Sequence, residues 1–504
     1  MMRQFFSCLL VSALSALPAA AQVAGSPSTG ATGLRTSTFD GSGQAMDSTG
    51  GQALPPAGGA APSATGSLPA VNPTQAQVYS LIGGTEEAGS AGLVGTGRQS
   101  QTRPFSDRVN AVRRVSANGG QGGALGNDVF DGETTYDAPL GLRVGTFTVV
   151  PQLTVSGGWS DNAAGSSSGR ANALYSVAPD LQIRSDWSRH QLDVSLRGSY
   201  AAYPGSSVRS EPSIETRAAL RLDAGDSTQI NSSLGHSYSR EDTSTAENPN
   251  GEGDVNVVNA SLGVTREAGI LAATLRGDVA RTMYSEGQSG ADRSGRDNTL
   301  YSATLRLDAR TGAMLQPFAE VTALRRAFDE DCAAPCIRRD AKGYALRSGV
   351  TIAAGPKLAG EVAAGWRVER LDSRQLQDLA GLTVDGSLVW SPTRLTTVTA
   401  GLTTTLSPSD LAGSSGSILY SADLRVSHAL SERLVAQAGA GYARRHYQGV
   451  GIEEATTSAL AGATYALTRN VALTGTYTYR TFDSSIAGAD YDENRIQAGV
   501  RIRR

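Results

Sequence analysis

The sequence predicts an all-β protein, a transmembrane antiparallel β-barrel of about 18 strands, with 16 as the alternative count. Three observations lead to this prediction. Between about residue 149 and residue 504, segments of ten to fourteen residues alternate apolar and polar side chains. The connections between segments alternate between short and long, and charged residues stand in the middle of segments. Because side chains alternate faces along a strand, such a sheet is apolar on one face and charged on the other.

The segment around residues 191–201 shows the alternation clearly. Leu192, Val194 and Leu196 share one face, whereas Asp193 and Arg197 share the other. A soluble sandwich buries its apolar face against a second sheet. Charges in the middle of strands instead favour a water-filled barrel interior, with the apolar face in contact with lipid. A β-propeller also has periodic strands, but it does not alternate short and long turns in this way.

The number of strands follows from the number of connections. Eight connections are expected to be short: Trp187–His190, Ala224–Ser227, Glu267–Gly269, Thr311–Ala313, Ala354–Pro356, Ser391–Thr393, Ala429–Glu432 and Leu467–Asn470. Nine are expected to be longer: residues 160–171, 204–212, 241–252, 285–297, 329–341, 371–377, 407–416, 448–455 and 483–492. Outer-membrane barrels have tight periplasmic turns and longer external loops. Seventeen alternating connections therefore predict 18 strands with both ends in the periplasm.

The residues before the barrel have a different composition. Residues 1–21 are predicted to be a secretory signal peptide, because a basic start and an apolar run precede the small residues Ala19-Ala20-Ala21. Residues 22–137 are rich in Gly, Ser, Pro and Ala and are predicted to be a mostly disordered periplasmic tail. A short helix is possible near residues 106–116. Arg103, Arg108, Arg113 and Arg114 make this part of the tail basic; a solvated linker is favoured over a docking segment or a plug.

The cysteines and the bulk composition fit a cell-envelope protein. After the predicted cleavage site only Cys332 and Cys336 remain, and we expect them to form a disulfide in an external loop. A redox role is disfavoured because three residues rather than two separate them. The chain is 39% hydrophobic with a mean hydropathy of −0.21, as barrels are when half of every strand is polar. No later stretch approaches the length of a transmembrane helix, so a membrane form must be a closed barrel.

Both ends of the predicted barrel resemble a known family. The motifs are residues 138–147 (APLGLRVGTF), residues 150–153 (VPQL), residues 157–162 (GGWSDN), residues 491–495 (YDENR) and residues 499–502 (GVRI). They are similar to the putative β-barrel porin type 2 group of bacterial outer-membrane proteins, and the likeness covers about residues 138–504. This resemblance implies a barrel domain in the bacterial outer membrane but no particular substrate. The chain departs from common barrel-assembly signals because it ends in Ile502-Arg503-Arg504 rather than in an aromatic residue.

Charged residues in the inward register are the candidates for function. An 18-stranded barrel leaves an aqueous channel unless loops fill it, and charges on its wall tune which solutes pass. The alternative is that neighbouring Arg and Asp residues only neutralise each other. The predicted pore-lining residues are Arg197, Arg217, Arg221, Arg276, Arg306, Arg425, Arg480, Arg501, Asp193, Asp278, Asp308 and Asp423. Aromatic residues on the outer register are expected to form interfacial girdles: Trp159, Tyr200, Tyr301, Tyr420, Tyr442, Tyr477 and Tyr479.

Other kinds of chemistry find little support in the sequence. The four histidines, at positions 190, 236, 428 and 446, stand in no catalytic pattern, and we expect no enzyme activity. No cofactor motif or metal-ligand cluster is evident, and the acidic run at residues 329–331 is interpreted as a solvated loop. A net charge of −3 gives no indication of nucleic-acid binding. The expected partners are outer-membrane lipid and the barrel-assembly machinery, with an oligomer possible.

The sequence leaves three functions open. The first is a porin-like passive channel for small hydrophilic solutes. The second is an outer-membrane component of exopolysaccharide export, which the family resemblance suggests, or a structural envelope barrel. The third is adhesion through external loops such as residues 241–252 and 285–297.

Overall fold

The structure is a computed structural model that describes residues 141–504 except 207, 226, 241–245, 247–252, 286–295, 330–337, 354–357, 394, 410 and 432. Several predictions lie outside these residues and stay predictions. They are the signal peptide, the tail with its short helix, the disulfide between Cys332 and Cys336, and most of the two loops considered for adhesion.

The described residues form one sheet of 19 antiparallel strands. The strands are β1 Leu142–Val144, β2 Phe147–Ser160, β3 Asn172–Ser185, β4 Gln191–Ala202, β5 Glu211–Asp223, β6 Thr228–Arg240, β7 Asp254–Ala268, β8 Leu271–Tyr284, β9 Asn298–Ala309, β10 Leu315–Phe328, β11 Ala341–Ala353, β12 Leu358–Leu371, β13 Leu379–Thr393, β14 Thr396–Ser407, β15 Gly416–Ala429, β16 Leu434–Gln448, β17 Glu453–Ala466, β18 Val471–Ser484 and β19 Tyr491–Arg503.

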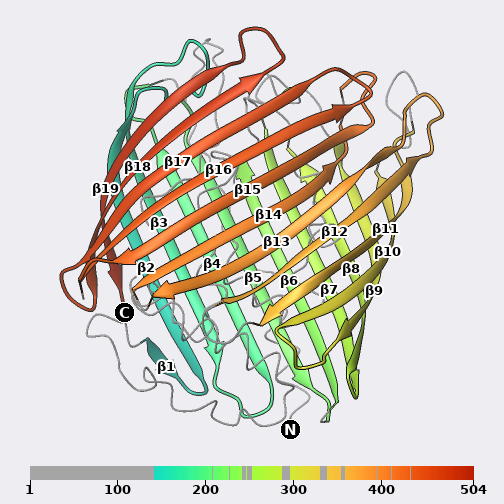
Figure 1. Ribbon diagram of the computed structural model, residues 1–504. Coiled ribbons are helices and arrows are strands. Elements are labelled where there is room, and N and C mark those ends of the chain that lie inside the picture. Colours follow the sequence, from blue (N-terminus) through green and yellow to red (C-terminus); the bar gives the residue numbers. More distant parts are fainter. Residues whose placement is uncertain are drawn as a thin grey trace. The chain divides into compact units, whose positions relative to one another are not determined.

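Strands β2 to β19 make a closed barrel wall of 18 strands (Figure 1). Each strand pairs with its neighbour in the sequence, and β19 pairs with β2 from Arg495↔Ser160 to Arg503↔Gln152. This last pairing removes both free edges, so all wall strands have a partner on each side. The predicted fold class and the count of 18 strands are confirmed.

Strand β1 is an addition that the sequence pattern did not predict. It forms a hairpin with the first residues of β2, and Gly145 in the turn has a φ of 63°. Strand β19 stops pairing at Gln152, where the backbone N–H of Arg504 donates to the Pro151 carbonyl at 3.2 Å. Strand β1 therefore continues the edge of β2 beyond the point where β19 ends.

The alternation of connections holds with local differences, including the expected loop 483–492, of which only residues 485–490 lie between β18 and β19. The end of the wall with the longer connections is called here the long-loop end, and the other the short-turn end. Residues 391–393 were expected to be a turn, but they end β13, because a register shift between Trp390 and Thr393 carries the strand further. The expected loop 448–455 is shorter, because β17 begins at Glu453, whose backbone pairs with His446 of β16.

The two faces of the wall differ as the alternation predicts. In β8 the Leu275 side chain is 61% exposed on the outer face, whereas the adjacent Arg276 is 1% exposed on the inner face. Strand β9 repeats the pattern, with Leu305 exposed and Arg306 enclosed. Exposed leucines beside buried arginines are the reverse of the arrangement in a soluble protein.

Most predicted girdle aromatics do lie on the exposed outer face, including Trp159, Tyr200, Tyr301 and Tyr442. Tyr420 differs, because part of β13 covers it. Its hydroxyl donates to the Leu382 carbonyl at 2.9 Å. This contact marks an irregular part of the wall, which is described below.

Candidate functional site: the charged inner wall

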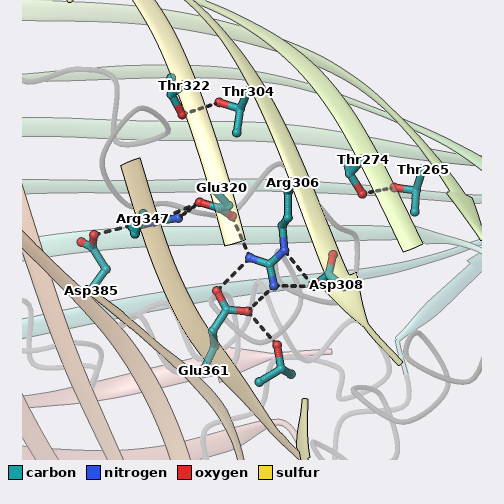
Figure 2. A network of polar contacts seen from close by, with 11 residues as sticks. Thr265, Thr274, Thr304, Arg306, Asp308, Glu320, Thr322, Arg347, Glu361 and Asp385 are labelled. Carbon is teal, nitrogen blue, oxygen red and sulfur yellow. Dashed lines mark hydrogen bonds and ion pairs between the residues drawn. The ribbon is translucent and has the colours of Figure 1, made fainter. Parts of the chain in front are cut away.

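A connected network of charged side chains covers the inner face of β9 to β13 (Figure 2). At its centre the Arg306 guanidinium is 0% exposed and contacts three carboxylates. The nitrogen–oxygen distances are 2.7 Å to Asp308, 2.8 Å to Glu320 and 3.0 Å to Glu361. Glu320 stands directly opposite Arg306 in the β9–β10 register, so regular strand pairing brings these two charges together.

The network extends from Glu320 to β13. The Arg347 Nε donates to Glu320 at 2.9 Å, and its Nη1 donates to Asp385 at 3.0 Å. On the other side, the Thr351 hydroxyl donates to Glu361 at 3.1 Å. One chain of hydrogen-bonded charges therefore joins five consecutive strands.

A second group of charges lies nearer the long-loop end of the same strands. The Arg326 Nε donates to Glu369 at 3.1 Å, and its Nη1 donates to the Asn298 side-chain oxygen at 3.0 Å. Arg367 also pairs with Glu369. All three charged side chains are almost fully buried.

Burial makes these ion pairs structurally important. Removing a charge from water is costly, and only close partners compensate for that cost. Arg306 has its partners at hydrogen-bonding distance on three sides, and charged hydrogen bonds of this kind are among the strongest in proteins. We conclude that the β9–β13 network holds neighbouring strands in register.

The inner face of β3 to β6 carries charges in a looser arrangement. Arg197 pairs with Asp180 at 3.0 Å, whereas Arg221 lies 3.5 Å from Asp223 and the side chain of Arg221 is 23% exposed. Arg217 is half-buried in the same inward register. Arg217 and Arg221 are closer to solvent than the arginines of the network, whereas Asp180 is buried.

All twelve predicted pore-lining residues belong to the inward register of their strands. The structure brings Arg276 to 2.8 Å from Asp278, and Arg306 to Asp308, as direct pairs. Arg480 stacks 5.2 Å from the centre of the Tyr491 ring. The structure does not gather the twelve into one site. The enclosed members are Arg276, Arg306, Arg425, Arg480, Arg501, Asp278 and Asp308, and the half-buried members are Arg197, Arg217, Arg221, Asp193 and Asp423. Their pore-lining role stays a prediction.

All three glutamates among these β9–β13 charges, and several arginines, were not predicted from the sequence. The missed residues are Asp180, Glu320, Arg326, Arg347, Glu361, Arg367, Glu369 and Asp385. They stand in the same inward register as the predicted residues, and the short connection at residues 310–314 fixes which residues of β9 and β10 are opposite. Aligning β9 with β10 through this short turn places Glu320 opposite Arg306, so this pair could have been predicted. The Arg306–Glu361 contact joins β9 to β12 across two intervening strands, and no local feature of the sequence indicates it.

No helix among the described residues is long and apolar enough to cross a membrane. No group of three or more His, Cys, Asp or Glu side chains among those residues is placed to hold a metal ion.

Comparison with known proteins identifies the family. The family model described as putative beta-barrel porin 2 matches residues 135–504. The chain belongs to this family. The resemblance seen in the two ends of the barrel is therefore confirmed, and with it the porin-like barrel architecture. No curated protein matches the chain.

Several solved structures share some likeness with the chain. The outer membrane protein OpdK from Pseudomonas aeruginosa is 11% identical, with a TM-score of 0.37, over 71% of this chain and 99% of that one. The copper transporter OprC is 10% identical, with a TM-score of 0.40, over 72% and 82%. The alcaligin receptor FauA from Bordetella pertussis is 12% identical, with a TM-score of 0.31, over 72% and 76%. At such TM-scores these likenesses carry no argument about function.

Proposed function

We propose that the protein is a barrel of the bacterial outer membrane that passes small hydrophilic solutes passively, without catalysis. The supporting observation is the alternation of exposed apolar and enclosed charged side chains along the strands, illustrated by exposed Leu275 beside enclosed Arg276. A closed barrel satisfies its backbone hydrogen bonds internally, which is the condition for crossing hydrocarbon with strands. On this proposal the apolar outer face contacts outer-membrane lipid.

The inner wall suggests which charges a solute would meet. Arg306 and its partners are committed to each other and enclosed, so we assign them to the stability of the wall. Arg217 and Arg221 are less enclosed, so we assign them to ion selectivity. Charged rings on a barrel wall act in this way in pores.

Planar-bilayer recording with the purified full chain tests the proposal. We expect stepwise conductance. We also expect Arg217→Gln together with Arg221→Gln to shift the reversal potential in a salt gradient toward cation selectivity. The matched control is Arg444→Gln, on the exposed outer register at the long-loop end, which should leave the reversal potential unchanged. The absence of any conductance steps, or recovery of the chain in a detergent-free soluble fraction, would contradict the proposal.

A further inference from the structure

The junction between β13 and β14 is the shortest in the barrel wall. The two strands pair from Gly386↔Leu402 to Trp390↔Val398, with one more pair at Thr393↔Thr396. Toward the long-loop end, residues 379–385 of β13 pair only with β12, and residues 403–407 of β14 pair only with β15. We call these two unpaired stretches the seam. Every other wall junction is paired over a longer stretch.

The β13 side of the seam lies over the outer face of the following strands. Leu379 packs against Leu406 of β14 and Ile418 of β15. Leu406 and Ile418 occupy the outward register of their strands, like the exposed Leu424, yet both are buried. A side chain added at Gly381 would meet Ile418 directly, and β13 contacts β15 although β14 separates them in the sheet. The wall therefore overlaps itself at this point.

Side chains replace the missing backbone partners along the β13 edge. The Gln448 side chain accepts from the Ala380 N–H at 3.0 Å and donates to the Ala380 carbonyl at 2.6 Å. Two residues further, the Tyr420 hydroxyl donates to the Leu382 carbonyl at 2.9 Å. These caps come from β16 and β15, two different strands that lie beyond β14.

Thr404 caps the next position on the same edge. Its hydroxyl accepts from the Val384 N–H and donates to the Val384 carbonyl, both at 2.8 Å. The Thr404 N–H in turn donates to the Asp385 carboxylate at 3.0 Å. Asp385 is also the last member of the inner-wall network, through Arg347 (Figure 2). The seam is therefore closed by polar side chains and linked to that network.

The capping side chains make the seam a stable part of the wall. An unpaired backbone group in hydrocarbon costs several kcal/mol, so a strand edge without partners is not tolerated in a lipid-facing wall. Here the alternate residues 380, 382 and 384 each have a side-chain partner. Separating β13 from β14 at this end breaks a few side-chain contacts, whereas the other pairs of wall strands are joined by longer backbone ladders.

We propose that the seam is a lateral opening in the barrel wall, through which the acyl chain of an amphiphile passes between the lumen and the surrounding lipid. Its outer side is apolar, with Leu371 and Tyr420 packed around Leu379, Leu406 and Ile418. Its inner side begins at the Asp385 carboxylate and the Arg347 guanidinium. A molecule with an apolar tail and a polar head matches this change of lining. This proposal rests on the membrane location proposed above and goes beyond passage of hydrophilic solutes.

A pair of cysteines across the seam tests the opening. Val384→Cys with Thr404→Cys, in a background whose native cysteines are serine, places two thiols where the native side chain touches the opposite backbone. The matched control, Leu388→Cys with Ala400→Cys, joins directly opposed residues of the same strands inside the paired stretch. The full chain in phospholipid vesicles is offered a dansyl-labelled fatty acid. Oxidation should abolish uptake of the probe into the barrel only in the seam pair, and reduction should restore it.

A second variant does not depend on disulfide formation. Thr404→Val removes the cap on Val384 without changing side-chain size, and Thr399→Val is the matched control in the paired stretch of β14. We expect amide hydrogen exchange in residues 379–385 to become about tenfold faster with Thr404→Val, the usual effect of losing one buried hydrogen-bond partner. We expect uptake of the probe to increase as well.

The outcomes separate this inference from the proposed function. Unchanged probe uptake after oxidation of the seam pair, or unchanged exchange in Thr404→Val, overturns the lateral opening. Ion conductance should persist in both oxidised pairs, because neither disulfide narrows the lumen. Loss of conductance in the parent chain would overturn the channel while leaving the uptake result to decide the seam.

Discussion

Two sides of the inner wall carry the same residue types in the same register, but they use them differently. On the β9–β13 side, Arg306 is 0% exposed and has three carboxylate partners, whereas on the β3–β6 side the Arg221 side chain is 23% exposed beside Asp223. The difference comes from strand pairing: Glu320 stands opposite Arg306, but Asn231 stands opposite Arg221. An inward position in the strand therefore does not by itself show whether a charge stabilises the wall or faces the lumen.

The largest expected effect on the free energy of unfolding comes from removing the central cation, Arg306. Arg306→Met leaves Asp308, Glu320 and Glu361 buried without it, and we expect a loss of about 3–5 kcal/mol of unfolding free energy. Arg221→Met on the other side should cost less than about 1 kcal/mol. Urea-induced unfolding in detergent micelles measures both. Equal losses would mean that the two sides do not differ energetically.

The next comparison is between two positions on the outer face of β8, one in the middle of the strand and one at its end. Leu275→Arg introduces a charge in the middle of the strand, and we expect it to cost about 2–4 kcal/mol, while Leu271→Arg beside the short turn should cost about 0–1 kcal/mol. The measurement is urea unfolding in phospholipid vesicles. If both variants were as stable as the parent, hydrocarbon would not surround this face.

A double-mutant cycle sharpens the comparison at the level of single pairs. Arg326→Met, Glu369→Met and the double variant should give a coupling energy of about 0.5–3 kcal/mol, because both side chains are buried and in contact. The same cycle on Arg221 and Asp223 should give less than about 0.5 kcal/mol, since that pair is partly exposed. A larger coupling for the second pair would contradict the assignment of the network to wall stability.

The smallest expected effect concerns a loop charge at the long-loop end. Hydrogen bonds from Arg281 hold the pKa of Asp329 below its ordinary value of 3.8. A lowered pKa stabilises the folded state fully above the ordinary pKa, and this contribution is lost as the pH falls through the pKa of the folded state. Both side chains are partly exposed, so Asp329→Asn should cost less than about 1 kcal/mol at neutral pH. At low pH the variant and the parent should unfold at the same urea concentration, and a difference that persists there would exclude this linkage.

Much of the architecture could be predicted from the sequence because barrels use local rules. Alternation assigned Leu275 and Arg276 to opposite faces, and the alternating connections gave 18 strands. Direct neighbours within one strand, such as Arg306 with Asp308, were also foreseeable. Partners on other strands were not, because they depend on strand register. The seam had no signal in the sequence, since Leu406 and Ile418 have the same pattern as outward residues that are exposed, such as Leu424.

The amino-acid sequence by itself therefore determined the strands, their two faces and the number of strands in the wall, because a period of two and a short turn are properties of neighbouring residues. Only the tertiary structure decided that Arg306 reaches Glu361, that Tyr420 lies beneath β13, and that the β13–β14 ladder stops at Gly386. These features depend on how distant strands meet when the sheet closes. Closure is a condition on the whole barrel that no single segment encodes.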